Sequence, residues 1–215
     1  MDVLTPHLAE LRVALTLDDP RRIMPAIPAG CRRVLDVGCG AGQTLIGSDL
    51  EPGVVACGTD RDVAALQLGR QLTERVTFVC AAGERLPFRS ASFDLVISRV
   101  ALPYMHVPTA LAEMRRVLVP GGRLWLVLHP LSMALRELVA AARTRRVKAV
   151  LGRLWVLANG LTLHAFGTLL RLPFARARCE SFQTTRAMRR ALRPGFQQIE
   201  IRRGTFFVVT ATRRG

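Results

Sequence analysis

The sequence has few of the residues on which several classes of protein depend. It holds five cysteines in 215 residues, and no two of them form a Cys-x-x-Cys pair, so neither a disulfide framework nor a zinc site is indicated. One tyrosine and two tryptophans leave few such rings for stacking nucleic-acid bases. No basic start followed by an apolar run opens the chain, so no cleaved secretory signal is expected and a cytoplasmic protein is predicted.

Acidic residues are scarce in one half of the chain only. The first 130 residues carry 14 Lys+Arg and 13 Asp+Glu, whereas the part from Leu131 onward carries 17 and 3. A neutral half joined to a basic half indicates that one part faces an anionic partner. Only Lys148 is a lysine, and this excess of arginine, with abundant alanine, also fits the codon bias of a GC-rich genome. Both interpretations stay open.

Short apolar runs alternate with helical patterns over the first 130 residues. Half of the residues are hydrophobic, which is enough for a globular core. Pro120-Gly121-Gly122 is expected to separate the last of these helices from the strand that follows it. Strands alternating with helices predict an α/β protein with a doubly wound, mostly parallel sheet. Strands are predicted at 33–37, 54–59, 75–80, 93–98 and 123–128, and helices at 8–17, 62–72 and 109–118.

The alternation stops at the end of the fifth strand. Residues 131–174 have a helical composition, with a basic part and then an uncharged part at 154–170. A helix at 181–192 is expected to begin at a cap formed by Ser181 or Thr184. Two further strands, at 196–201 and 205–210, predict a terminal antiparallel hairpin.

The strongest chemical signal is the string Val34-Leu35-Asp36-Val37-Gly38-Cys39-Gly40-Ala41-Gly42. A buried strand runs into glycines, which let a ligand approach the backbone because no Cβ intervenes. Asp60 ends the next strand, 20 residues after Gly40, where a carboxylate can accept both hydroxyls of a ribose. The Gly-x-Gly-x-Gly spacing differs from the Gly-x-Gly-x-x-Gly of Rossmann dehydrogenases, and a P-loop would need Gly-Lys-Ser/Thr.

This string resembles motif I of the class I S-adenosylmethionine-dependent methyltransferases. The resemblance continues in the family's order through Gly58-Thr59-Asp60, Glu84-Arg85-Leu86-Pro87-Phe88, Ser92-Phe93-Asp94-Leu95-Val96 and Pro120-Gly121-Gly122-Arg123-Leu124. It covers about residues 30–130 and points to the branch that holds the ubiquinone and menaquinone biosynthesis methyltransferases. The resemblance implies a Rossmann-like, mostly parallel seven-stranded sheet with a C-terminal antiparallel hairpin and a helical cap inserted after strand five.

The same resemblance implies a single methyltransferase domain over residues 1–215. Within it, residues 30–130 would form the cofactor-binding core, and residues 131–180 the helical cap insertion. Residues 181–215 would supply a closing helix and the terminal hairpin.

S-adenosyl-L-methionine is the cofactor that the resemblance implies, and no metal is expected. Its methionine end is expected near the glycines, its ribose at Asp60, and its adenine beside Arg61. The branch usually has an acidic residue where this chain has Ala82, so Gly83 or Glu84 is expected to serve the adenine instead. The residues assigned to the cofactor are Asp36, Gly38, Cys39, Gly40, Asp60, Arg61, Gly83, Glu84 and Ser98.

Three residues after the fourth and fifth strands are candidates for the acceptor side. His129 follows the fifth strand, and Tyr104 and His106 follow the fourth, at the sheet edge where ligands bind in such folds. Each is a candidate general base or substrate contact, and a structural role is the alternative for each. The family usually covers its acceptor with the leading helix and with insertions after the fifth strand.

The uncharged stretch 154–170 offers few polar groups to pair with a polar acceptor. It is either a lid helix buried against the sheet, or a lid that opens onto an apolar substrate or dips into a membrane surface. In the second case a basic set would face anionic headgroups: Arg143, Arg145, Arg146, Lys148 and Arg153.

The predicted function is methyl transfer to a small, apolar acceptor such as a quinone precursor, a lipid or another metabolite. The alternative is an RNA methyltransferase that uses the basic half, although the family's amino-methylating Asn/Asp-Pro-Pro-Tyr/Phe motif is replaced here by Ser98-Arg99-Val100-Ala101. A non-catalytic cofactor-binding partner protein is the third hypothesis.

Overall fold

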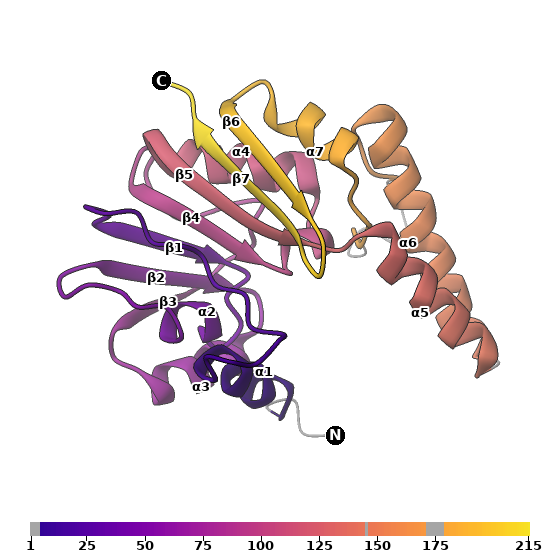
Figure 1. Cartoon of the computed structure of the whole chain (residues 1–215), viewed down its shortest axis with the longest axis horizontal. Helices are drawn as coiled ribbons and strands as arrows, with labels where there is room; N and C mark the ends of the chain where they lie inside the picture. The colour runs from indigo at the N-terminus through magenta and orange to yellow at the C-terminus, as the bar shows by residue number, and fades with distance from the viewer. Residues whose placement is uncertain (1–4, 145, 171–178) are drawn as a thin grey trace.

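A computed structural model describes residues 5–144, 146–170 and 179–215 of the chain. The described residues form a seven-stranded sheet in the order β3-β2-β1-β4-β5-β7-β6 (Figure 1). Strands β1 to β5 pair in parallel, and β7 runs antiparallel to both β5 and β6. The predicted fold class is therefore confirmed. The strands are β1 Arg33–Val37, β2 Val55–Asp60, β3 Val76–Cys80, β4 Phe93–Arg99, β5 Leu118–Leu128, β6 Phe196–Arg203 and β7 Phe207–Arg213.

Helices pack on both faces of the sheet. On one face, α4 and α7 enclose a core to which β1 contributes Leu35 and Val37. On the other, α2 and α3 pack over a second core that includes Val34. This alternation along β1 is the two-residue period of a strand buried on both sides. The helices are α1 Thr5–Leu15, α2 Gln43–Ile46, α3 Val63–Leu72, α4 Val107–Val117, α5 Leu131–Arg143, α6 Val147–Phe166 and α7 Thr185–Leu192, with a 3₁₀ turn, η1, at Leu102–Tyr104.

The fifth strand starts earlier than the sequence pattern predicts. Leu118 already pairs with Phe93, and the ladder resumes at Arg123 opposite Leu95 after a register shift. The Pro-Gly-Gly segment lies inside β5 as an irregularity and does not separate helix from strand, so that expectation is wrong. A proline lacks the N–H of a regular ladder, and Gly121 adopts φ +76°, so the extra residues bulge while the strand continues.

The last helix and the terminal hairpin are present as predicted, and the structure shows which residue caps the helix. Thr184 is the cap of α7, because its hydroxyl accepts a hydrogen bond from the Ala187 N–H at 3.1 Å. The Ser181 hydroxyl instead accepts from the Gln183 side chain. After α7, strands β6 and β7 form the expected antiparallel hairpin.

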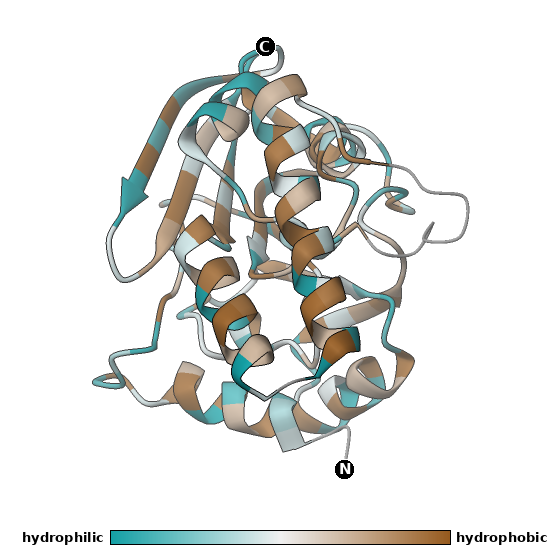
Figure 2. Cartoon of the chain, turned by 90° about the vertical axis from the view of Figure 1, so that its right-hand side faces the viewer, coloured by the Kyte–Doolittle hydropathy of each residue, from teal (hydrophilic) through white to brown (hydrophobic). Residues whose placement is uncertain are grey.

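Helices α5 and α6 form a hairpin that projects from the body of the molecule (Figure 1). They pack on each other, and Ala134, Val156 and Phe182 form a small separate core at their contact. The sides of the two helices that face away from this contact are exposed, and only 22 % of the most apolar 18 residues of α6 are buried. The interpretation of 154–170 as a helix buried against the sheet is thus wrong. Helix α5 and the α7 region cover only one side of α6, and the composition of the stretch does not reveal this. Figure 2 shows the hydrophobic residues along both helices.

Candidate cofactor and acceptor site

The glycine loop leaves the carboxyl end of β1 in a conformation that needs glycine. Gly38, Gly40 and Gly42 have φ values of +78°, +55° and +82°. The backbone N–H groups of Gly38 and Cys39 both donate to the carbonyl of Thr59, at 2.7 and 2.9 Å, which fixes the loop against the end of β2. A side chain at these glycines would be strained in the left-handed region.

Asp36 is buried beneath this loop with an unsatisfied carboxylate. It is 1 % exposed, and neither of its oxygens has a hydrogen-bond partner among the described residues. The pKa of Asp36 is raised to about 7, chiefly by burial. The positive charge of Arg99 lowers this pKa in part, the negative charge of Asp60 adds to the rise, and the nearby Thr44 hydroxyl has a smaller lowering effect. An orphaned buried carboxylate is costly for a fold, so its retention indicates a ligand that brings a hydrogen-bond donor or a cation.

Asp60 lies where the prediction places the ribose. Its Oδ2 accepts from the Gly40 N–H at 2.8 Å, and its Oδ1 accepts from the Asp62 N–H at 3.0 Å. Each oxygen retains acceptor capacity, since an ionised carboxylate offers about four lone-pair sites. Arg61 follows with an exposed side chain. The carboxylate therefore both orders the glycine loop and presents acceptors at the end of β2.

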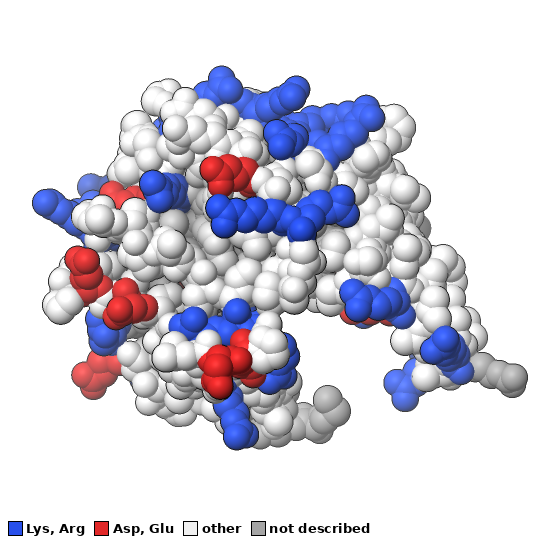
Figure 3. Space-filling view, in the orientation of Figure 1, with Lys and Arg blue, Asp and Glu red and all other residues white. Residues whose placement is uncertain are grey.

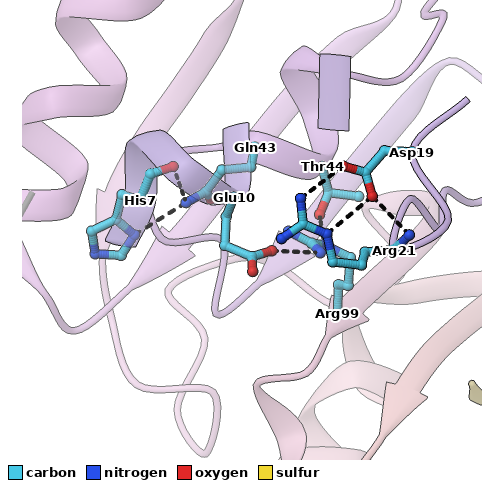
Figure 4. Close-up of polar contacts among 7 residues, drawn as sticks. All are labelled: His7, Glu10, Asp19, Arg21, Gln43, Thr44 and Arg99. Atoms are coloured by element: carbon cyan, nitrogen blue, oxygen red, sulfur yellow. Dashed lines mark hydrogen bonds and ion pairs between the residues drawn. The ribbon is translucent and has the colours of Figure 1, made fainter. Parts of the chain in front are cut away.

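The leading helix α1 covers the glycine loop through a set of polar contacts (Figure 4). Arg99, at the end of β4, donates to Glu10 of α1 at 3.0 Å and to the Thr44 hydroxyl of α2 at 3.1 Å. The Gln43 amide contacts the ring nitrogen of His7 at 3.1 Å. The sequence interpretation missed Arg99, although a basic residue directly after Ser98, at the carboxyl end of a parallel strand, was a usable signal.

The loop after β3 lies against the residues that follow η1. A Cβ on Gly83 would clash with Met105, and a Cβ on Gly38 would clash with Ala101. Glu84 accepts a hydrogen bond from the backbone N–H of His106 at 2.8 Å. Glu84 thereby holds the start of α4, so its role toward the adenine stays a prediction with one of its oxygens already occupied.

Two residues assigned to the cofactor point their side chains into the protein. The thiol of Cys39 packs in the core where a Cβ on Gly58 would collide with it, and burial raises its pKa well above the ordinary value. The hydroxyl of Ser98 is fully buried and donates to the carbonyl of Val37 at 2.8 Å. Both side chains thus support the loop from below, and a contact between the cofactor and the backbone of either residue stays a prediction.

On the acceptor side, His129 and Tyr104 lie together at the base of α5. Their rings meet edge to face with centroids 5.4 Å apart. His129 is buried, and its Nε2 has no hydrogen-bond partner in the described part of the chain. Burial, together with the positive charge of Arg153, lowers the pKa of His129 to about 4. Its imidazole is therefore neutral at pH 7 and able to accept a proton.

His106 is placed differently from the other two candidates. It is the N-terminal cap residue of α4, and its Nδ1 lies 2.7 Å from the Thr109 hydroxyl. A structural role at the start of the helix accounts for these contacts, so the structure supports the alternative reading for His106. Of the three acceptor-side candidates, the structure brings together His129 and Tyr104.

Comparison with known proteins finds a methyltransferase domain in part of the chain. A family model described as a methyltransferase domain matches residues 35–126, which span the glycine loop, Asp60 and strands β1 to β5. Residues 35–126 are therefore similar to the methyltransferase domain family, and this match covers less than half of the chain. Asp36, the glycines and Asp60, which the sequence pattern singled out, all lie inside the matched region.

Curated relatives match this methyltransferase over about half of its length. A malonyl-[acyl-carrier protein] O-methyltransferase from Herminiimonas arsenicoxydans is 39 % identical over 106 residues, which are 48 % of this chain and 38 % of the relative. A phthiotriol/phenolphthiotriol dimycocerosates methyltransferase from Mycobacterium leprae is 39 % identical over 98 residues, 43 % of this chain and 36 % of the relative. The chain thus covers less than half the length of these relatives.

Solved structures share the fold at low sequence identity. The YcgJ protein from Bacillus subtilis superimposes with a TM-score of 0.56 and 19 % identity, covering 87 % of this chain and 95 % of that one. The CurJ carbon methyltransferase gives a TM-score of 0.60 at 19 % identity, covering 88 % of this chain and 50 % of that one. At this level of identity the likeness extends to the fold alone.

Proposed function

We propose that this chain transfers a methyl group from S-adenosylmethionine to a small, apolar acceptor such as a quinone precursor, a lipid or another metabolite. The observation that carries the cofactor half is the buried, unpartnered Asp36 carboxylate beneath a glycine loop that Asp60 orders. The cofactor's methionine end carries an ammonium group. This group would donate hydrogen bonds to the unpartnered Asp36 oxygens and would balance their negative charge.

The residues of the chain hold and orient, while the cofactor supplies an activated methyl on its sulfonium. Asp36 binds the ammonium end, and Asp60 accepts from the ribose hydroxyls. Helix α1 is tied to Arg99 through Glu10 and so lies over the loop. Positioning a nucleophile against a fixed methyl lowers such a barrier by roughly 7–11 kcal/mol, so little further chemistry is required of the protein.

His129 and Tyr104 would supply the polar contacts of the acceptor. The His129 imidazole is neutral, which is the form that a general base needs, and its Nε2 is unpartnered among the described residues. Its lowered pKa makes it a weaker base than a free imidazole, so a strongly acidic hydroxyl or carbon is the acceptor that it fits. Its neighbours on α5 and α6 are apolar and partly exposed, and Figure 3 shows the molecule hollowed between this hairpin and the part that holds α1. An apolar acceptor suits such surroundings, because a polar one would bury unpaired groups.

The names of two relatives bear on the acceptor, and one of them names a lipid-type substrate. One is named for malonyl-[acyl-carrier protein] and another for phthiotriol dimycocerosates. Each matches less than half of this chain, so their names bear on the chemistry of transfer more than on the acceptor itself.

The test is transfer of tritium from methyl-labelled S-adenosylmethionine to a panel of acceptors. The panel holds a hydroxyquinone, a long-chain fatty acid, malonyl-[acyl-carrier protein] and transfer RNA. We expect label in an organic-soluble product, loss of label with Asp36→Asn, and little change with Cys80→Ser, an exposed cysteine at the end of β3. Failure of the wild-type chain to bind the cofactor in calorimetry would refute the proposed function.

RNA is the second candidate acceptor, and the charge of the C-terminal half favours it. Helix α7 and strand β6 carry exposed arginines, and Figure 3 shows basic residues gathered over this end of the visible face. Non-specific binding to the phosphate backbone would follow from such charge. Label recovered in transfer RNA and not in the organic phase would make RNA the acceptor.

A further inference from the structure

The α5–α6 hairpin exposes apolar side chains in regular stripes. On α5 they follow a spacing of four residues, at Leu131, Leu135 and Val139. On α6 Val147 is 69 % and Leu151 is 61 % exposed, and Leu154 and Leu161 continue the same side of the helix. Contiguous exposed apolar surface of this kind marks an interaction site.

The outer end of the same hairpin is uniformly basic. Arg143 ends α5, Arg146 precedes α6, and Lys148 lies in its first turn, all with exposed side chains. No aspartate or glutamate occurs in the sequence between Glu137 and Glu180. Figure 3 shows blue without red at this end of the visible face. An anionic surface is therefore the partner that matches the charge.

An acidic protein would match the basic charge of this end but would not account for the exposed apolar residues beside it. The apolar residues flank the basic end on both helices, so the two properties occur together along the outer half of the hairpin. Apolar side chains beside Lys and Arg are the pattern of helices that lie in the interface of a membrane. Arginine and lysine then reach the headgroups while their neighbours enter the acyl boundary.

We propose that the outer half of the α5–α6 hairpin, residues 139–144 and 146–154, docks on the surface of an anionic lipid bilayer. The docking is peripheral, with Arg143, Arg146 and Lys148 at the headgroups and Val147 and Leu151 in the acyl boundary. Helix α6 is long and apolar enough to cross a membrane by length and composition, but it packs on α5 and α7 and buries Val156 and Leu163 in doing so.

Ion pairs connect the two helices of the hairpin to each other and to the residues before α7. Arg153 on α6 forms ion pairs with Glu137 on α5 at 3.0 Å and with Glu180 at 2.7 Å. The base of the hairpin, where α5 begins, follows β5 and His129 in the chain. The proposed docking surface and the acceptor side are therefore connected through α5. An apolar acceptor would then pass from the bilayer along the hairpin to the site, a step that rests on the proposed function.

Vesicle flotation tests the docking without cofactor or acceptor, so its outcome is independent of methyl transfer. The probes are vesicles of phosphatidylcholine alone and of phosphatidylcholine mixed with an equal part of phosphatidylglycerol. We expect the chain to float with the mixed vesicles only, and to be released as the salt rises and the Debye length falls from about 10 Å at 0.1 M to about 3 Å at 1 M.

Charge variants identify the surface. Replacing Arg143, Arg146 and Lys148 with glutamine should lower the partition coefficient on the order of 100-fold, since each basic residue near a bilayer contributes about a fivefold change. The matched control replaces Arg123, Arg193 and Arg202, which are exposed elsewhere, and should leave binding within a few-fold of wild type. Equal losses in both triple variants would refute docking through the hairpin.

Apolar variants test insertion. Leu151→Asp should lower binding strongly, whereas Leu17→Asp, at an 81 % exposed position after α1, should not. Circular dichroism with unchanged helix content keeps the comparison valid. Wild-type flotation that ignores lipid charge, or absence of flotation with both compositions, would overturn the proposal. Loss of acceptor turnover in Leu151→Asp without any vesicle binding by wild type would instead assign the stripe to the acceptor.

Discussion

At the scale of single residues, two buried groups have pKa values displaced in opposite directions. Burial raises the pKa of Asp36 to about 7 and lowers that of His129 to about 4, because burial disfavours the charged form of either group. Both also have side-chain atoms without hydrogen-bond partners among the described residues. Such groups are concentrated at functional sites, and these two lie on the cofactor side and the acceptor side.

The first prediction is that cofactor binding releases a proton. An ammonium group stabilises the ionised Asp36, so binding lowers a pKa that is about 7 in the free chain. Affinity should therefore fall as the pH drops below 7, by up to about tenfold per unit. Calorimetry in two buffers with different ionisation enthalpies measures the protons released. An Asp36→Asn chain should bind more weakly and release none, and equal affinity at pH 5.5 and 8 would contradict the prediction.

The second prediction concerns His129. His129→Gln removes a neutral proton acceptor while keeping an amide of similar reach, so turnover should fall by about 10²–10⁴-fold if the residue acts as a general base. The dissociation constant of the cofactor should stay within a few-fold of wild type, because His129 follows β5 rather than the glycine loop. His106→Gln is the matched control and should retain most activity. Equal losses in both variants would assign His129 to the fold.

At the scale of elements, the helical cap depends on one close approach. Gly160 of α6 lies against the ring of Phe182, which packs between α5 and α6, and a Cβ there would clash with the ring. Gly152, two turns earlier on the same helix, has open space around its Cα. The two glycines are therefore expected to respond oppositely to the same substitution.

The third prediction compares Gly160→Ala with Gly152→Ala. Overpacking at Gly160 should lower the free energy of unfolding by about 1–3 kcal/mol, less the gain in helix propensity. At Gly152 the propensity gain acts alone and should stabilise by up to about 1 kcal/mol. Urea unfolding followed by circular dichroism measures both. Stabilisation by both substitutions would mean that Phe182 does not anchor the cap.

At the scale of the whole molecule, the displaced pKa values shape stability against pH. Native Asp36 holds its proton between its unfolded pKa of 3.8 and about 7, so stability falls as pH rises through that window. Native His129 stays unprotonated between about 4 and its unfolded value of 6.5, so its contribution rises with pH over nearly the same range. The two slopes oppose each other and largely cancel.

The fourth prediction is that Asp36→Asn reveals the rise of stability with pH that His129 produces and that Asp36 cancels in the wild-type chain. Without Asp36, stability should rise from pH 4 to pH 6.5 through His129, and at pH 8 the variant should exceed wild type by up to about 4 kcal/mol. Melting temperatures over this range measure the effect in the absence of cofactor. A variant that is stabilised yet binds the cofactor poorly has exchanged function for stability. Parallel pH profiles for the two chains would contradict the assigned pKa values.

The sequence by itself determined the cofactor-binding core of this protein, because its signals are local. The short apolar runs of the buried strands, the glycines after Asp36 and the acid at the end of β2 each depend on neighbours in the chain. The alternation of strands and helices predicted the parallel pairing of β1 to β5, whereas their order in the sheet came from the structure.

Only the tertiary structure decided what depends on distant residues. Arg99 gained its place through Glu10, 89 positions away, and Cys39 and Ser98 turned inward because of what packs around them. The pairing of Tyr104 with His129 joins two strand ends, and the open side of α6 results from where α5 and α7 lie. Composition records that a helix is apolar, but burial depends on which neighbours the fold brings to each of its sides.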